Sequence, residues 1–203
     1  MTLGWAMALG FGIGLRHAAD ADHLLALGTL CPPGTSPLKA ARAAAFWGLG
    51  HSASLLGVGG LVVLLGLRVP EAFEPLAELA VGAMLVTLGV LHLIGKGTKP
   101  SEASSLGQRR ALAVGFVHGM AGSAGASLLA VAAQPDSHSA FAYLVLFGAG
   151  TVAGMVLISL LLGGPLSVGK GRGSVLLGRL AALGGVAMGI VAGGHALGHL
   201  LGG

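Results

Sequence analysis

The residues best suited to chemistry lie in one short segment near the amino terminus. Arg16, His17, Asp20, Asp22 and His23 fall within eight residues, and apolar sequence flanks them on both sides. Two imidazoles with carboxylates form a ligand set suited to divalent ions such as Ni, Co, Zn and Cu. The segment therefore predicts a site for a divalent transition metal.

The apolar surroundings of this cluster argue that it faces the protein interior. An ionisable group at the centre of a bilayer costs on the order of 2.5–3.5 kcal/mol. On a regular helix His17, Asp20 and His23 share one face, whereas Asp22 points elsewhere. Either Asp22 interacts with the metal ligands without binding the ion itself, or the helix is distorted here. The alternative is a buried salt-bridge cluster in which Arg16 pairs with Asp20, but that arrangement leaves Asp22 and both histidines unexplained.

The composition of the chain predicts an integral membrane protein. Of the 203 residues, 54% are hydrophobic and only 9% are charged, whereas soluble domains carry about 25% charged residues. A lipid bilayer must therefore cover much of the surface. We expect an all-α fold in which residues 1–203 form a single membrane domain. The net charge of +4 falls mainly in short loops, so we interpret it as a sign of topology and not of nucleic-acid binding.

Apolar segments separated by charged or proline-containing stretches predict six transmembrane helices. They are Leu3–Leu30, Ala44–Leu67, Leu76–Ile94, Ala111–Ala133, Ala140–Gly163 and Val175–Leu197. Lysine and arginine residues concentrate in the first, third and fifth loops, at Lys39, Arg42, Lys96, Lys99, Arg109, Arg110, Lys170 and Arg172. Positive loops mark the cytoplasmic side. We therefore expect a multi-pass protein of the cell (inner) membrane with both termini on the outer side.

An internal repeat of about 100 residues appears within the six predicted helices. The segment Gly14–His17 resembles Gly115–His118, which lies 101 residues later. The segment Gly82–His92 resembles Gly185–His195 in the same way. Both matches place a histidine at the corresponding position, which favours a true repeat over chance similarity among glycine-rich helices.

Three helices per repeat is an odd number, so consecutive repeats must cross the membrane in opposite directions. We therefore predict two inverted three-helix repeats, residues 1–95 and 111–203, joined by a basic cytoplasmic linker at 96–110. Inverted repeats are a common plan of secondary transporters, with the substrate near the bilayer midplane between the halves.

Three sequence elements resemble the nickel/cobalt transporter family. The His-x4-Asp-His pattern of His17, Asp22 and His23 is similar to its first metal-site motif, and Leu49–Ser52 is similar to its Gly-His-Ser element. The segment Gly115–Ser123 resembles the short six-helix branch, which includes permeases associated with urease and hydrogenase maturation. The resemblance implies transport of Ni²⁺ or Co²⁺, with Zn²⁺ left open, and nickel-enzyme maturation proteins as partners. Longer members carry an acidic element in the second half that this chain lacks.

Our hypothesis is a permease for Ni²⁺ or Co²⁺ that moves the ion into the cytoplasm, and not an enzyme or a carrier of a resident cofactor. The predicted metal-binding residues are His17, Asp20, Asp22, His23, His51 and His118. The chain has no Gly-x4-Gly-Lys phosphate-binding motif, so the membrane potential, a proton gradient or a partner must drive transport. Association into a homo-oligomer stays open.

Two other kinds of function compete with this hypothesis. Ser127 in a Gly-x-Ser motif, together with His195, resembles the layout of rhomboid-like intramembrane serine proteases. A serine and a histidine suffice for nucleophilic chemistry, but Leu128 replaces the glycine that follows the serine in that family. The other alternative is a metal efflux protein or a metal-sensing membrane subunit.

Overall fold

The computed structural model describes residues 3–31, 35–97, 105–122, 134, 136–168 and 172–202. Within these residues every regular element is a helix, which confirms the all-α prediction. The helices are α1 (Leu3–His17), α2 (Ala21–Leu30), α3 (Pro37–Leu65), α4 (Phe73–Leu93), α5 (Ser105–His118), α7 (Ser137–Val168) and α8 (Arg172–Gly202).

Four of the described helices are long and apolar enough to cross a membrane. They are α3, α4, the Ser137–Leu161 part of α7 and the Val175–Gly202 part of α8. Each exceeds the roughly 20 residues that span a hydrocarbon core of about 30 Å. The chain is therefore a membrane protein, as its composition predicts.

The first predicted span, Leu3–Leu30, is not one helix as expected. It divides into α1 and α2, and residues 18–20 between them form a turn. The Ala19 and Asp20 backbone N–H groups donate to the carbonyls of Arg16 and His17, three residues earlier. Asp20 then adopts an extended backbone (φ −65°, ψ 149°), which ends one helix and begins the next.

The fourth predicted span, Ala111–Ala133, is also interrupted within its described part. Helix α5 ends at His118, and Gly122 adopts a positive φ of 75° that favours glycine. The backbone N–H of Gly122 donates to Glu74 Oε1 at the start of α4, at 2.6 Å. Residues 123–133 of this span lie outside the described residues.

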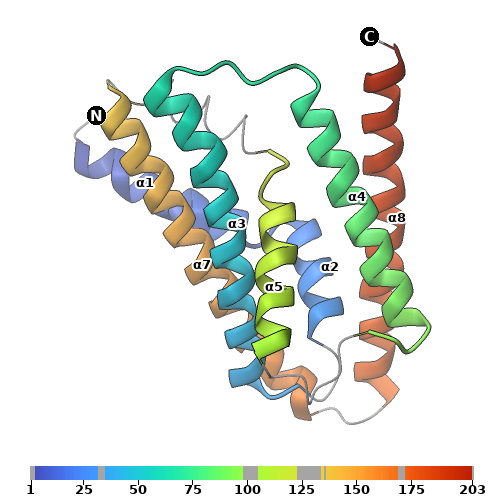
Figure 1. Ribbon diagram of the computed structural model, residues 1–203. Coiled ribbons are helices and arrows are strands. Elements are labelled where there is room, and N and C mark those ends of the chain that lie inside the picture. Colours follow the sequence, from blue (N-terminus) through green and yellow to red (C-terminus); the bar gives the residue numbers. More distant parts are fainter. Residues whose placement is uncertain are drawn as a thin grey trace.

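The long helices form two antiparallel pairs, and two shorter helices end at the centre of the molecule. Helix α3 runs against α7, and α4 runs against α8 (Figure 1). Helix α1 lies along α7, and α5 lies along α3. As a result the carboxyl ends of α1 and α5 both reach the middle of the α3–α7 pair.

Glycines permit the close approach of these helices. A Cβ atom added to Gly50 of α3 would overlap the carbonyl oxygen of Leu112 in α5. The same addition to Gly150 of α7 would overlap the carbonyl oxygen of Phe11 in α1. Small residues of this kind bring helix backbones together in lipid, where no hydrophobic force acts between helices.

Helix α7 begins directly after Asp136, outside the apolar part of the helix. The Asp136 carboxylate accepts hydrogen bonds from the backbone N–H and the hydroxyl of Ser139, at 2.9 and 2.8 Å. The backbone bond, then the hydroxyl bond, lowers the pKa of this exposed carboxyl below its usual value. Both bonds favour the ionised side chain near the positive end of the helix dipole.

Candidate metal site

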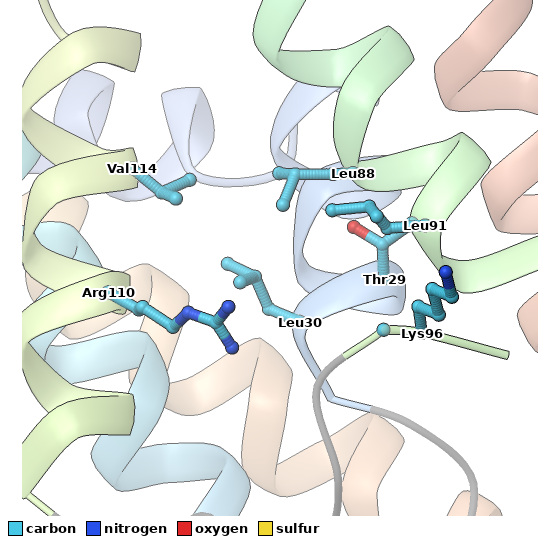
Figure 2. Close-up of a pocket in the computed structure, with 8 residues that line it drawn as sticks. Thr29, Leu30, Leu88, Leu91, Lys96, Arg110 and Val114 are labelled. Atoms are coloured by element: carbon cyan, nitrogen blue, oxygen red, sulfur yellow. The ribbon is translucent and has the colours of Figure 1, made fainter.

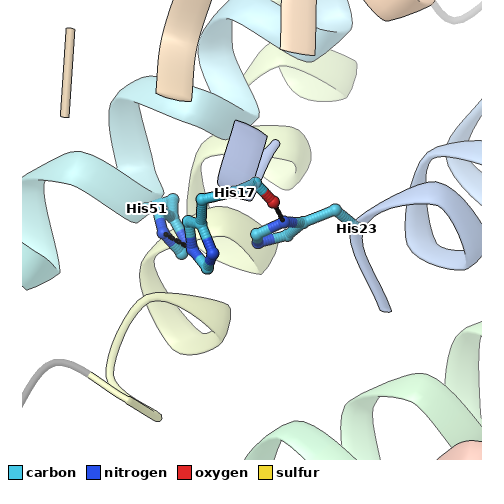
Figure 3. A group of neighbouring side chains, drawn as sticks. All are labelled: His17, His23 and His51. Carbon is cyan, nitrogen blue, oxygen red and sulfur yellow. Dashed lines mark hydrogen bonds between the residues drawn. The ribbon is translucent and has the colours of Figure 1, made fainter. Parts of the chain in front are cut away.

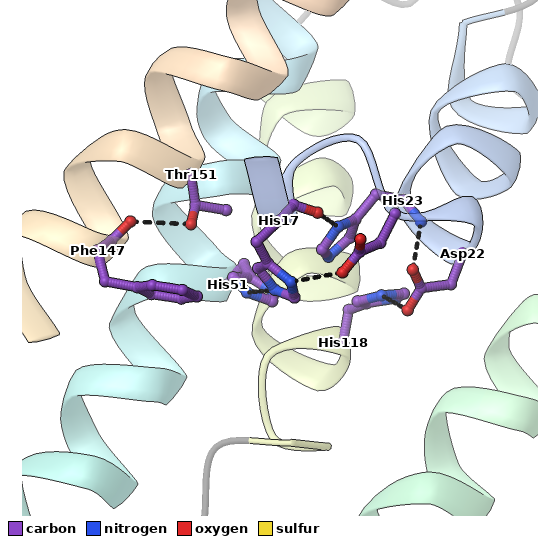
Figure 4. Close-up of polar contacts among 8 residues, drawn as sticks. His17, Asp22, His23, His51, His118, Phe147 and Thr151 are labelled. Atoms are coloured by element: carbon purple, nitrogen blue, oxygen red, sulfur yellow. Dashed lines mark hydrogen bonds and ion pairs between the residues drawn. The ribbon is translucent and has the colours of Figure 1, made fainter. Parts of the chain in front are cut away.

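Four histidines from four helices meet in the middle of the molecule. His17 ends α1, His23 lies in the first turn of α2, His51 lies midway along α3, and His118 ends α5. The ring centroid of His23 lies 4.5 Å from that of His17, 4.8 Å from that of His118 and 5.1 Å from that of His51. The side chains converge on one point (Figure 4).

All the residues predicted from the sequence as metal ligands belong to this cluster or touch it. They are His17, Asp20, Asp22, His23, His51 and His118. The break in the first span makes this convergence feasible, because α1 and α2 can approach from different directions. The histidine–aspartate cluster, as we call these six residues, is thus built from segments that are far apart in the sequence.

The hydrogen bonding of His23 fixes a tautomer that suits metal binding. Its Nδ1 lies 2.8 Å from the carbonyl oxygen of His17 (Figure 3). Because a carbonyl only accepts, Nδ1 must carry the hydrogen, and a neutral His23 then has a bare lone pair on Nε2. Nε2 is buried and has no hydrogen-bond partner among the described residues. Metal-ligating histidines typically donate their other ring N–H in this way.

His17 also carries its ring hydrogen on Nδ1, but its Nε2 already has a partner. Its Nδ1 lies 2.8 Å from Asp20 Oδ2, and a carboxylate that orients a histidine is a frequent feature of metal sites. The Nε2 atom of a neutral His17 therefore accepts a hydrogen bond from His51 Nε2 at 3.3 Å, which an ion at this position must replace. His17, His23 and His51 each offer a ligand atom, all within 4.8 Å of one another. We call this group the three-histidine position (Figure 3).

A second group of potential ligands shares His23 with the first. Asp22 Oδ1 accepts from the backbone N–H of His23 at 2.9 Å, and Asp22 Oδ2 lies 3.0 Å from His118 Nε2. Ligand atoms of Asp22, His23 and His118 also lie within 4.8 Å of one another. We call this group the aspartate position. Asp22 reaches it because the helix breaks before residue 21, which is the distorted-helix alternative considered from the sequence.

Burial differs between the members of the cluster. The residues His23, His51 and His118 are only 2–3% exposed, whereas the side chains of His17 and Asp20 are 29% and 50% exposed. The side chain of Asp22 is 32% exposed, so the cluster has a buried centre of three histidines and an accessible edge formed by Asp20, His17 and Asp22.

Aromatic rings that the sequence reasoning did not single out form the walls of the cluster. The Trp47 ring lies 5.4 Å from that of His23 and 5.6 Å from that of His118. The Phe147 ring, shown in Figure 4, lies 5.2 Å from that of His17. Trp47 precedes His51 by four residues in α3, a spacing that places two side chains on one helix face. Its position one helical turn before His51 is the sequence feature that could have identified Trp47 as a neighbour of the site.

The other ionisable residues discussed from the sequence lie apart from the cluster. In the described structure Asp20 forms its ion pair with His17 and not with Arg16, so the predicted alternative of an Arg16–Asp20 pair is wrong. His195 is exposed on α8, where its ring contacts that of His199 at 4.6 Å. Ser127, which the protease alternative requires, lies outside the described residues.

A cavity of about 80 Å³ lies between α2, α4 and α5, away from the histidines (Figure 2). Lys96 and Arg110 line it together with apolar side chains such as Leu30, Leu88 and Val114. Two cationic side chains disfavour a divalent cation by like-charge repulsion. The histidine–aspartate cluster is therefore the better candidate for metal binding.

Comparison with known proteins adds independent evidence. The chain is 29% identical over 177 residues to the urease accessory protein UreH of Bacillus sp., covering 80% of this chain and 78% of that protein. It is 29% identical over 178 residues to the Arabidopsis thaliana chloroplast protein FOR GROWTH AND FERTILITY 1, of which it spans 48%. It is 34% identical over 92 residues to the high-affinity nickel transport protein of Cupriavidus necator, of which it spans 24%. No family model and no solved structure matches the chain.

Proposed function

We propose that this chain belongs to a nickel/cobalt transporter-like family and is a membrane permease that carries Ni²⁺ or Co²⁺ into the cytoplasm through the histidine–aspartate cluster. Its similarity to a urease accessory protein and to a nickel transport protein supports the family. The observation that carries the proposal is the buried, unpartnered Nε2 of His23 among three further imidazoles. The two nickel- and urease-related relatives are transport or accessory proteins, which agrees with a chain that is not an enzyme.

The ligand chemistry supports a borderline divalent ion as the transported substrate. Imidazole nitrogens suit Ni, Co, Zn and Cu, whereas Mg and Ca prefer oxygen ligands. The cluster offers four imidazoles for two carboxylates, which favours the first group of metals. Choosing among Ni²⁺, Co²⁺ and Zn²⁺ depends on coordination geometry, and we favour nickel because of the named nickel transport relative.

We further propose six membrane crossings in two inverted units, residues 1–95 and 111–203, with 96–110 as the connection. The broken first crossing comprises α1 and α2, and α5 begins the fourth. His17 and His118, which are 101 residues apart, both end such half-helices. The opposite directions of α3 and α7, and of α4 and α8, support the inversion (Figure 1).

Equivalent contacts in the two halves also support the repeat. A Cβ added to Gly14 would overlap the Phe147 carbonyl oxygen, and a Cβ added to Gly115 would overlap the Trp47 carbonyl oxygen. Gly14 and Gly115 are 101 residues apart, and Trp47 and Phe147 are 100 apart. The same helix–helix contact thus occurs twice. In one case α1 of the first half packs on α7 of the second, and in the other α5 of the second half packs on α3 of the first.

We infer the direction of transport from the distribution of charge. Helices α3 and α5 begin at the same end of the molecule (Figure 1). Near these starts the sequence places Lys39 and Arg42 in α3, and Arg109 and Arg110 in α5. Lys99 and Lys170 lie outside the described residues. Placing this basic end in the cytoplasm puts both termini outside the inner membrane. The membrane potential then favours inward movement of a divalent ion by about 4.6 kcal/mol per 100 mV, twice the value for one charge.

The imported metal would serve proteins that mature nickel enzymes. The support for this part of the proposal is the name of the Bacillus relative, a urease accessory protein. The permease would release the metal ion into the cytoplasm, where the maturation proteins can bind it. This supply of metal requires no protein–protein interface between them.

Replacing His17 with alanine should reduce metal accumulation to background. His17 contributes Nε2 to the three-histidine position and lies at the accessible edge of the cluster, so its loss removes a ligand of that position. The measurement is uptake of radioactive Ni²⁺ by cells that produce the wild-type chain, the His17→Ala variant or the His138→Ala control, whose histidine is exposed on α7. Protein in the membrane fraction must be equal.

Normal uptake by the His17→Ala variant would rule out the proposed site. Wild-type cells that export preloaded metal would point instead to efflux. A wild-type chain that binds the ion without moving it would point to a sensor.

A further inference from the structure

We propose that the transported ion occupies two overlapping positions in turn, first one and then the other, and that His23 is a ligand in both. The inference rests on the proposed function, because it describes how a permease of this kind moves its ion. The two positions are the three-histidine position (His17, His23 and His51) and the aspartate position (Asp22, His23 and His118).

The hydrogen bonding of His23 limits the cluster to one ion at a time. The Nδ1 atom of His23 is occupied by its bond to the His17 carbonyl at 2.8 Å. Only Nε2 remains, and its single lone pair can bind one metal ion. The two positions are therefore mutually exclusive, although their other ligands come from different side chains.

The arrangement of the other ligands permits transfer without releasing the ion. His51 and His118 approach His23 from different helices, and their own ring centroids are 5.9 Å apart. An ion bound to His23 can gain Asp22 and His118 while it loses His17 and His51. Exchange of this kind keeps at least one protein ligand on the ion, which avoids exposing a bare divalent charge to a low-dielectric interior.

The two positions differ in charge, which gives the exchange an energetic direction. The three-histidine position offers only imidazoles as ligands, and its nearest carboxylate, Asp20, acts on the ion only through its bond to His17 at 2.8 Å. At the aspartate position the Asp22 carboxylate is itself a ligand, so it places one negative charge directly on the ion. The ion is thus better stabilised at the aspartate position.

Both positions are closed by a hydrogen bond while they are empty, and in the three-histidine position this is the bond between His17 Nε2 and His51 Nε2 at 3.3 Å. His118 Nε2 lies 3.0 Å from Asp22 Oδ2, so the ion must replace a hydrogen bond between its own future ligands. Binding through His118 Nε2 requires the neutral tautomer with hydrogen on Nδ1, a buried atom without a partner among the described residues. This replacement provides a barrier that separates the two positions.

Each position is completed by a histidine from a different part of the chain. His17 ends α1 and belongs to the three-histidine position, whereas His118 ends α5 and belongs to the aspartate position. Passage from one position to the other therefore transfers the ion from the end of one half-helix to the end of the other. Movement of α1 and α5 relative to α3 would alter the two positions separately.

The test compares His51→Ala with His118→Ala in purified protein and in membrane vesicles. Each variant removes one position and leaves the other intact, so each should still bind one Co²⁺ by isothermal titration, with an affinity lower by about 10- to 100-fold at most. Both should lose Co²⁺ uptake into vesicles. The double variant should bind no ion, and the wild type should bind one.

Matched variants keep the outcome interpretable. His51→Asn and His118→Asn should repeat the result with smaller changes in packing, and His199→Ala, at an exposed histidine of α8, should behave as the wild type. Each protein must elute as a single species in detergent. If the alanine variant at one of these histidines is unfolded, the asparagine variant at the same position is used for the comparison, and the reverse also holds.

Several results would overturn the two-position inference. They are two ions bound at once to the wild type, uptake at the wild-type rate by either single variant, or loss of all binding in either single variant that remains folded. In the last case, wild-type binding and uptake would still support the proposed function with a single site. Absence of uptake by the wild type itself would contradict the proposed function instead.

Discussion

Replacing His23 with alanine or leucine should remove metal binding almost completely. His23 belongs to both groups of ligands, and its Nε2 is the atom that neither group can replace. Loss of a residue that only orients a metal ligand costs about 10- to 100-fold in affinity. Loss of a ligand shared by both positions should therefore weaken binding by more than about 100-fold, a larger effect than at any other member of the cluster.

The measurement is Co²⁺ or Ni²⁺ binding to the purified variants in detergent. Leucine fills the buried volume next to Trp47 without supplying a ligand, so His23→Leu separates loss of the ligand from creation of a cavity. His138→Ala serves as the control, because His138 is exposed at the start of α7. Wild-type affinity in a folded His23→Leu protein would show that the ion binds elsewhere.

Replacing Gly115 with alanine should disrupt the packing of α5 against α3. A Cβ atom at this position would overlap the backbone carbonyl oxygen of Trp47 and lie 2.7 Å from the Trp47 ring. Backbone atoms cannot move aside as a flexible side chain can, so the helices must separate. We expect a loss of about 3 kcal/mol in the free energy of unfolding, which corresponds to a fall in Tm of about 6–12 °C.

The control for this prediction is Gly57→Ala in α3, where a Cβ atom meets nothing within 4 Å. Alanine is favoured over glycine in a helix by about 1 kcal/mol, so this variant should be as stable as the wild type or slightly more stable. Thermal unfolding of both proteins in the same detergent provides the comparison. Equal Tm values for the Gly115 and Gly57 variants would show that α5 is not held against α3 as described.

The location of the candidate site could be predicted from the sequence because ionisable groups are costly in an apolar segment. His17, Asp20, Asp22 and His23 stand out in a chain with 9% charged residues. The repeat between Gly14–His17 and Gly115–His118 indicates His118 as a further metal-binding residue, and the Gly-His-Ser element indicates His51. Both residues lie beside His23 in the structure.

The break of the first helix could be suspected from the sequence but not placed. Helical periodicity put Asp22 on the wrong face for a metal ligand, which left a distorted helix as one of two explanations. The turn at residues 18–20 depends on His17, whose carbonyl oxygen and Nδ1 bond to His23 and Asp20. These bonds form only once the side chains are packed together, so local propensity does not reveal them.

The contact between Asp22 and His118 could not be predicted from the sequence either. These residues are 96 positions apart, and their meeting requires α5 to lie along α3 at one particular depth. Gly50 and Gly115 set that depth, but a glycine-rich sequence does not show which glycines face which helix. The division of the ligands into two groups that share His23 follows from this contact.

The central claim, that the transported ion binds in the histidine–aspartate cluster, is tested most directly by X-ray absorption spectroscopy of the purified wild-type protein loaded with one equivalent of Ni²⁺. The account predicts scattering from at least two imidazole rings around the nickel, and a loss of that signal in the His23→Leu variant. A shell of oxygen atoms without imidazole scattering, or a spectrum that His23→Leu leaves unchanged, would contradict it.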